Sequence, residues 1–491
     1  MKRFAAICLS VICLVSLLSG CGRNNQEEQN PIIVHMPGVT EAMYDAAYWT
    51  GKVKEPDVVL MDADDIELFN EQTVAKSGGE VVDLVGYAST VTGTQLKRWL
   101  GEAQLPASDL YAADGSLYGE GYFDELVASV NAEGVADSNK VSFAIAAANA
   151  PVRLFPTMNA AYEDMELREE DVFQQGMLLV GEAVVVLHMN FGQDWFYVQS
   201  ANQRGWVRME DLILMEKGSW VSYQEETLFL VVTAPSITLE VDPYNPAVSG
   251  QTLYMGTKLP LYDDDHVGSE ISGRGSEGCY VVQYPTLNSF GYLEYQPALI
   301  PISDDVSIGY LDYTPANVVR QAMSLVGARN CVNRLAGGRD NAAFVVDIYR
   351  VFGITMPSTT AQQKKLTAIE TDMASESSDE RLKTLTEANP GSLLFSGDQA
   401  FIYLGMDEKV PYVVAPVPEY YYDNKAHVTN SCILTSLEVV RRDGTAFLDS
   451  LRSLKVLGVE EEKEDEKDGG KAEGDVKTTT KAAKDAKEEN K

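Results

Sequence analysis

Short apolar runs separated by turn residues fill the middle of this chain, and they constrain its fold more than any other feature. They extend from Val141 to Leu214 and include Leu178–Leu187 and Trp195–Val198. Runs of this length at short spacing are typical of small β-barrels, and a second β-rich segment extends from Leu228 to Ile302. The pattern therefore predicts two tandem barrels, over residues 140–217 and 225–305.

Helix signals replace the short strands at Thr314. Thr314 can cap a helix whose first residue is Pro315, and a second amphipathic pattern over Ala342–Phe352 ends at Gly353. Apolar strand runs follow at residues 392–395, 400–404, 412–414 and 432–440. Two helices followed by a run of strands predict an α+β domain over residues 310–458. The fold class expected for the whole chain is therefore multidomain α+β.

The start of the chain has the pattern of an export signal. Lys2 and Arg3 precede an apolar run, Phe4–Leu18, which is shorter than the roughly 20 residues needed to span a bilayer. This indicates a signal peptide over residues 1–20. Leu18-Ser19-Gly20-Cys21 resembles the lipobox of bacterial lipoproteins, in which a diacylglyceryl group is attached to the cysteine. The resemblance implies that Cys21 is lipidated and that the exported protein is anchored to the outer face of the cytoplasmic membrane, in the cell envelope.

The two flanks of these domains have weaker patterns. Residues 21–139 begin as a polar tether and continue as an N-terminal domain or wrap, with short helix patterns near Asp64 and Leu96. Residues 459–491 are rich in Lys, Glu, Asp and Ala without apolar periodicity, which predicts a disordered charged tail.

The charge and cysteine content exclude several classes of function. Acidic residues exceed basic residues by 34, and the tail from Glu460 onward, with twelve acids and eight lysines, supplies little of that excess. The folded body is therefore acidic, and we expect no nucleic-acid partner because phosphates repel such a surface. Beyond Cys21 the cysteines are Cys279, Cys331 and Cys432, too few for a disulfide scaffold. No Cys/His cluster has metal-ligand spacing, so we expect neither a metal nor a cofactor.

In their order along the chain, these segments resemble the SH3b-containing branch of the NlpC/p60 cysteine peptidases. Ala150–Thr157 resembles the entry into the first SH3b barrel, Gly205-Trp206-Val207 its end, and Met255–Leu261 the second barrel. Gly309-Tyr310-Leu311 and Thr314–Asn317 resemble the lead into the peptidase helix. The resemblance implies two tandem SH3b-like barrels followed by a papain-like α+β domain. It also implies a relation to enzymes that cleave the γ-D-glutamyl–diamino-acid bond of peptidoglycan peptides.

The chemistry of that family needs a cysteine thiolate at a helix N-terminus, a histidine base on a neighbouring strand and a third polar residue that orients the histidine. Where the family has Asp-Cys-Ser, this chain has Asp340-Asn341-Ala342, so Asn341 stands at the nucleophile position. Where the family has Gly-His before a Leu-Tyr-Leu-Gly strand, this chain has Gln399 in place of the histidine. Ala415, which follows Tyr412-Val413-Val414, stands at the third position.

These replacements argue against the family's reaction. An amide cannot become a thiolate, and the loss of a nucleophile or a base alone costs on the order of a million-fold in rate. The Tyr-Gly-Trp-Gly-Gly stretch that lines the family's cleft is replaced as well, by Asn330–Arg334. We therefore expect a pseudoenzyme, not an active enzyme, that binds peptidoglycan peptides or another envelope protein without hydrolysis.

Three residues are candidates for ligand binding. Asp340 corresponds to the family's acidic residue beside the nucleophile, which helps to hold the free amine of the substrate, but it can equally cap the following helix. Trp195 and Trp206 can line a binding groove or belong to the core of the barrel. His188 lies on a predicted strand and is interpreted as structural.

Two alternatives remain open at this point. Cys331 is a relocated nucleophile of an active cell-wall cysteine peptidase if the fold brings it to a base such as His427, which is near Cys432 in sequence. Buried cysteines, however, mostly behave as small hydrophobic residues. In the second alternative the chain is a purely structural surface scaffold. A pocket with convergent donors near Asp340 favours binding, whereas a filled apolar cleft favours the scaffold.

Overall fold

The computed structural model describes residues 35–263, 268, 270–303, 305–397, 399–460 and 476–477. The predicted signal peptide, the lipobox cysteine Cys21 and most of the charged tail lie outside these residues. From Met36 onward the described residues belong to one compact unit. Among the residues described, no helix is both long enough and apolar enough to cross a bilayer.

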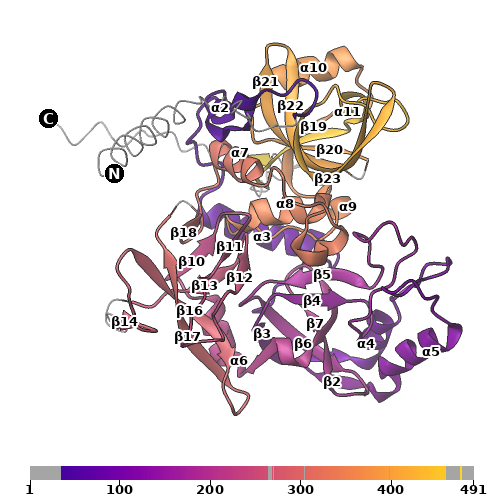
Figure 1. The fold of residues 1–491 in the computed structure, drawn as a ribbon, viewed down its shortest axis with the longest axis vertical. Helices are drawn as coiled ribbons and strands as arrows, with labels where there is room; N and C mark the ends of the chain where they lie inside the picture. Colours follow the sequence, from indigo (N-terminus) through magenta and orange to yellow (C-terminus); the bar gives the residue numbers. More distant parts are fainter. Residues whose placement is uncertain are drawn as a thin grey trace, which may run out of the picture. The chain divides into compact units, whose positions relative to one another are not determined.

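The first predicted barrel is an antiparallel sheet, drawn in magenta in Figure 1, with the strand order β5-β4-β8-β7-β6-β3-β9. Both faces of the sheet are buried. Val185 and Trp206 belong to one core, and their neighbours Val184 and Val207 belong to the other. This burial explains why the strands read as nearly continuous apolar runs. The elements are β3 Ser142–Ala146, β4 Ala150–Arg153, β5 Gln174–Leu178, β6 Ala183–Met189, β7 Trp195–Gln199, β8 Arg204–Arg208, η3 Met209–Asp211, β9 Leu212–Met215 and α6 Lys217–Gln224.

The second predicted barrel consists of several small sheets around one core. Strand β10 pairs with β13 and β18, and the hairpin β16–β17 is joined to β13 through a bridge between Leu261 and Val282. Leu230, Leu259 and Tyr284 are buried in the shared core. The elements are β10 Phe229–Val232, β11 Ser236–Thr238, β12 Thr252–Tyr254, β13 Lys258–Pro260, β14 Glu270–Ile271, β15 Arg274–Gly275, β16 Cys279–Leu287, β17 Leu293–Pro301 and β18 Val306–Ile308.

The C-terminal domain is an antiparallel sheet with the order β19-β24-β20-β21-β22-β23. Its two predicted helices are confirmed. Thr314 Oγ1 accepts a hydrogen bond from Asn317 N at 3.1 Å, with Pro315 at the first position of α7, and Gly353 follows the end of α8 with φ +80°. The elements are α7 Pro315–Ser324, η4 Val332–Gly337, α8 Asn341–Arg350, α9 Thr360–Gln363, β19 Ala368–Asp372, α10 Ser378–Glu387, β20 Leu393–Ser396, β21 Gln399–Asp407, β22 Val410–Tyr422, β23 Lys425–Ser436, α11 Phe447–Ser450 and β24 Ser453–Leu457.

The described N-terminal segment packs into the cores of two other modules instead of forming a core of its own. Trp49 and Phe69 are fully buried in the core of the C-terminal domain, whereas Leu96 and Leu126 are buried in a core of the first barrel. The segment is therefore a wrap. Its elements are η1 Glu41–Tyr44, α2 Ala46–Thr50, α3 Ala63–Lys76, β1 Thr90–Thr92, α4 Gly93–Leu100, α5 Glu120–Ser129, η2 Ala132–Gly134 and β2 Ser138–Lys140.

Part of the segment predicted to be a disordered tail forms a strand. Val476–Lys477 (β26) pairs with Val459–Glu460 (β25). Glu460 also exchanges two hydrogen bonds with the side chain of Gln72 in α3, at 3.0 and 3.1 Å, and its carboxylate lies 2.7 Å from Lys76 Nζ. These contacts tie the end of the C-terminal domain to the N-terminal wrap.

A matched pair of neighbouring residues in α3 tests the wrap. Phe69→Ala is expected to lower the free energy of unfolding by about 3–5 kcal/mol, because Phe69 is fully buried and its removal leaves a cavity. Leu68→Ala is expected to cost less than about 1 kcal/mol, because Leu68 is 40% exposed. Urea unfolding of both variants measures the difference. Equal small effects would show that the wrap does not belong to the core of the C-terminal domain.

Candidate functional site

The first candidate position lies at the N-terminus of α8. Asn341 is the first residue of the helix, and Asp340 caps it by accepting a hydrogen bond from Ala343 N at 2.9 Å. Phe344, Val345 and Ile348 bury the helix in the core of the domain. The local sequence thus places residue 341 where a helix dipole lowers the pKa of a thiol, but the residue there is an amide.

The second candidate position, Gln399, is the first residue of β21, beside Asn341. Ala400 N donates to Asn341 Oδ1 at 3.4 Å, so the fold brings the two positions together. Gln399 Oε1 accepts from Arg441 Nη2 at 2.8 Å. The same nitrogen donates to the hydroxyl groups of Ser450, at 2.7 Å, and Ser396. The guanidinium of Arg441 therefore occupies the space next to the side chain of Gln399.

The third candidate position, Ala415, lies on β22 in the next strand of the sheet and is fully buried. Ile402 pairs with Val414. One residue further along the same register, Ala415 faces Phe401, on the side of the sheet that carries Gln399. Asn341 and Gln399 are thus neighbours and Ala415 lies on the adjoining strand, and the three side chains are two amides and a methyl group.

The loop before α8, which includes Asn330–Arg334, contacts the first barrel. Asn333 and Arg334 adopt left-handed backbone conformations, with φ +51° and +59°. Asn333 Nδ2 donates to the carbonyl of Gln174 in β5 at 2.7 Å, and Val332 N donates to the carbonyl of Glu169 at 3.1 Å. The loop is thus fixed between the first barrel and the C-terminal domain.

A buried ion network holds this loop against α8. Asp347 is fully buried, and its carboxylate lies against Arg334 and 2.6 Å from Arg339 Nε. Arg339 Nη2 also donates to the carbonyl of Pro235 in the second barrel at 2.6 Å. Burial alone would raise the pKa of Asp347, but the two guanidinium groups outweigh it and hold the pKa below its usual value.

The ligand-binding candidates Asp340, Trp195 and Trp206 all make structural contacts within the protein. Both carboxylate oxygens of Asp340 accept backbone hydrogen bonds, Oδ1 from Ala343 N and Oδ2 from Asn333 N at 2.8 Å. Trp195 is 6% exposed and Trp206 1% exposed, within a core of the first barrel. His188 Nε2 lies 3.1 Å from the carbonyl of Asn131, and burial lowers the pKa of the ring. The helix-cap interpretation of Asp340 and the core interpretation of both tryptophans fit these contacts.

The geometry does not support Cys331 as a relocated nucleophile. Asn330 N donates to the carbonyl of Asn430 at 2.8 Å, which brings the segment alongside β23. The ring of His427, however, stacks on Tyr420 with centroids 5.0 Å apart. Cys331 is buried, and burial raises the pKa of its thiol. Burial also raises the pKa of Cys432, to about 12. Thiols in this state stay protonated at neutral pH.

A groove of about 290 Å³ lies next to the loop, between the first barrel, the wrap and the C-terminal domain. Its lining includes Trp99, Glu102, Tyr197, Arg204, Trp206 and Asn333. The guanidinium of Arg204 lies 4.1 Å from the centroid of the Trp99 ring, and its Nε donates to Gln199 Oε1 at 2.8 Å. Aromatic surface next to charges of both signs suits a peptide with a free amine and carboxylates.

The groove and Arg441 are the parts of the site that sequence reasoning missed. Trp99 and Arg204 are 105 positions apart and belong to different segments, and no motif links them. Arg441 reaches Gln399 across 42 residues from a loop that carries no sequence signal. Within the described part of the chain, no group of three or more His, Cys, Asp or Glu residues is arranged to hold a metal ion.

The pH dependence of stability tests the ion network. At neutral pH, Asp347→Asn is expected to lower the free energy of unfolding by about 3–5 kcal/mol, because it leaves two buried guanidinium groups without their counter-charge. The pKa of Asp347 in the folded chain lies below the unfolded value of about 3.9. The stabilisation that its charge contributes is therefore present above the unfolded pKa and is lost as the pH falls through the folded pKa.

Urea unfolding of the native chain and Asp347→Asn at a series of pH values between about 7 and 3 measures this effect. Asp379→Asn, at an exposed position in α10, is the matched control. If the difference in unfolding free energy between the native chain and Asp347→Asn does not decrease at acidic pH, the Asp347 carboxylate is not the charge that stabilises the network.

Comparison with known proteins identifies the architecture. The family described as SH3 domain (SH3b1 type) matches residues 160–208. No curated protein sequence matches the chain. Among solved structures, a novel NlpC/P60 endopeptidase from Photobacterium damselae subsp. piscicida has 14% identity and a TM-score of 0.66, over 87% of this chain and 99% of that chain. An NlpC/P60 family protein from Bacillus cereus has 16% identity and a TM-score of 0.40, over 58% of this chain and 82% of that chain.

The SH3b match and the likeness to the Photobacterium structure confirm the predicted fold class. The chain is a multidomain α+β protein with an SH3b domain, and over most of its length it has the fold of an NlpC/P60 endopeptidase. At 14% identity the likeness shows the fold and leaves the activity to be argued from the residues.

Proposed function

We propose that this chain, a protein with an SH3b domain and the fold of NlpC/P60 endopeptidases, is an exported lipoprotein that holds cell-wall peptides without cleaving them. One observation supports the lack of hydrolysis most directly. Asn341 and Gln399, which the family resemblance aligns with the nucleophile and the base, are neighbours, and the side-chain oxygens of both amides accept internal hydrogen bonds. A site of this composition supplies neither a nucleophile nor a base.

The groove beside the loop supports the binding part of the proposal. It adjoins the loop that carries Asn333, which itself hydrogen-bonds to Asp340 at the start of α8. Arg204 Nη1 and Glu102 Oε2 lie 3.9 Å apart as an ion pair, and a bound peptide would exchange this pair for its own carboxylate on Arg204 and its own amine on Glu102. Stem peptides of peptidoglycan carry both groups. The lipobox at Cys21 supports the location, because a lipid anchor keeps the groove near the wall.

A hydrolysis assay on purified muropeptides tests the lack of activity. The native chain is expected to release no product above the buffer rate, because the loss of a nucleophile or base costs on the order of a million-fold. Cys331→Ala is expected to be indistinguishable from the native chain. Hydrolysis that disappears in Cys331→Ala would contradict the proposal and establish a relocated nucleophile.

Co-sedimentation with purified peptidoglycan sacculi tests the binding. Arg204→Met is expected to weaken binding by about tenfold or more, because it removes a charge-assisted hydrogen bond to the peptide carboxylate. Arg320→Met is the matched control, because Arg320 is exposed on α7 and bonds only Asn317 among the hydrogen bonds of the described residues. If the native chain does not sediment with sacculi, or if both variants bind equally well, the groove is not a peptide site and the scaffold alternative gains support.

A further inference from the structure

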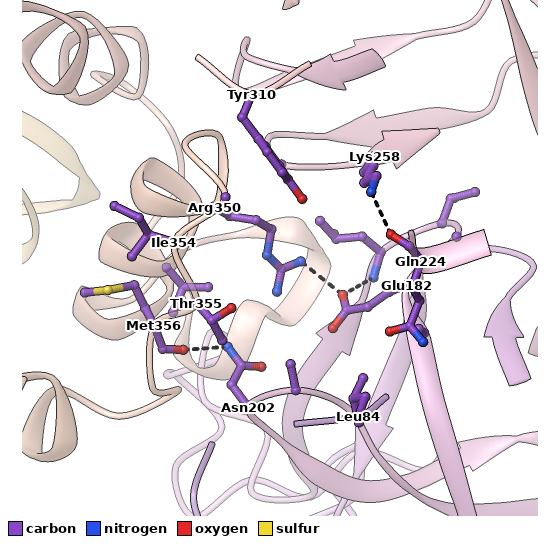
Figure 2. Close-up of a pocket in the computed structure, with 18 of the residues that line it drawn as sticks. Leu84, Glu182, Asn202, Gln224, Lys258, Tyr310, Arg350, Ile354, Thr355 and Met356 are labelled. Atoms are coloured by element: carbon purple, nitrogen blue, oxygen red, sulfur yellow. Dashed lines mark hydrogen bonds and ion pairs between the residues drawn. The ribbon is translucent and has the colours of Figure 1, made fainter. Parts of the chain in front are cut away.

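A second cavity lies where both barrels meet the C-terminal domain, away from the N-terminus of α8. Its volume is about 240 Å³, and it adjoins the end of α8 at Arg350. Figure 2 shows Lys258 and Gln224 on one side of the cavity and Ile354 and Met356 on the other. The cavity is therefore polar at one end and apolar at the other.

The only carboxylate that lines this cavity in the described structure is already neutralised. Glu182 Oε2 accepts hydrogen bonds from Arg350 Nη1 and from Leu179 N, both at 3.0 Å (Figure 2). Arg350 comes from the C-terminal domain and Glu182 from the first barrel, so this pair also forms the wall between the two modules. Its charges cancel, and the balance of charge in the cavity depends on Lys258.

Lys258 carries a positive charge that no carboxylate neutralises at contact distance among the described residues. Its Nζ donates to the carbonyl of Gln224 at 3.1 Å and lies 4.1 Å from the centroid of the Phe229 ring. Glu226 raises the pKa of Lys258 through its charge, but less than burial lowers it. Burial lowers the pKa of Lys258, which reflects the cost of holding an unneutralised ammonium group there. Two of the three N–H groups remain for a ligand.

Other polar groups around the ammonium lack partners or face the cavity. The hydroxyl of Tyr223 and Gln224 Nε2 are enclosed and have no hydrogen-bond partner. Tyr310 is 44% exposed, yet burial raises the pKa of its hydroxyl. The Tyr310 ring lines the cavity, so its exposed part faces this concave space and not the outer surface.

We propose that this cavity binds a small amphiphile with an oxyanion headgroup. The headgroup, a carboxylate or a phosphate monoester, accepts hydrogen bonds from Lys258. The apolar chain lies along Ile354 and Met356. Such a ligand supplies the counter-charge that the buried ammonium group of Lys258 lacks at contact distance. The ligand contacts three modules at once. Asn341, Gln399 and Ala415 do not line this cavity.

Calorimetric titration tests the proposal on the chain from Gly22 onward, which retains the whole compact unit that begins at Met36. The probes are sodium hexanoate and hexyl phosphate, with hexylammonium as the probe of opposite charge. Hexanoate or hexyl phosphate is expected to bind, and the stronger of the two identifies the headgroup. Absence of binding by both, or equal binding of hexylammonium, would overturn the proposal.

Variants of the cavity separate specific binding from adsorption. Lys258→Met is expected to weaken binding by about tenfold or more, and Lys258→Arg to retain most of it. Lys217→Met is the matched control, because Lys217 also lies over an aromatic ring, Phe143, but outside the cavity. Thr355→Phe, which fills the cavity and leaves Lys258 in place, is expected to abolish binding. Unchanged binding in Lys258→Met and Thr355→Phe would locate the probe elsewhere and refute the assignment.

Discussion

The carboxylate of Asp347 lies inside the C-terminal domain with a guanidinium group on each oxygen. A single charge at this depth is strongly unfavourable, so Arg334, Arg339 and α8 must take their positions together. The same loop reaches the first barrel through Asn333 and the second barrel through Arg339. This ion network, together with the pair of Glu182 and Arg350, joins both barrels to α8, and the groove and the interdomain cavity lie between the modules so joined.

The parts of the fold that were predictable are those with local signals. Helix α7 has a capping threonine followed by proline, α8 has an aspartate cap and a terminal glycine, and both were found within a few residues of the expected bounds. The wrap was not predictable in this way, because Trp49 and Phe69 become buried only against residues of the C-terminal domain. Apolar side chains in a short amphipathic helix do not reveal which distant surface covers them.

The candidate site, like the fold, was predictable from the sequence only in part. Positions Asn341 and Gln399 were chosen by their order along the chain and lie side by side in the structure, with Ala415 on the adjoining strand β22. The role of Trp206 was ambiguous because its sheet is buried on both faces, so alternation carries no information about a groove. Helix α8 is held by its cap and its buried face, and neither involves the side chain of residue 341. The stability of this helix therefore does not depend on which side chain stands at position 341.

The contacts between α3 and the end of the C-terminal domain have a consequence for the order of synthesis. Gln72 and Glu460 are 388 residues apart in the chain. At about 5–20 residues per second, roughly 20–80 seconds separate their appearance from the ribosome. During that interval Trp49 and Phe69 lack the complete C-terminal domain that buries them, whereas Leu96 and Leu126 can already pack on the first barrel. The final burial of Trp49 and Phe69 therefore waits for the last strands of the domain, because their core includes Leu457 and Val459.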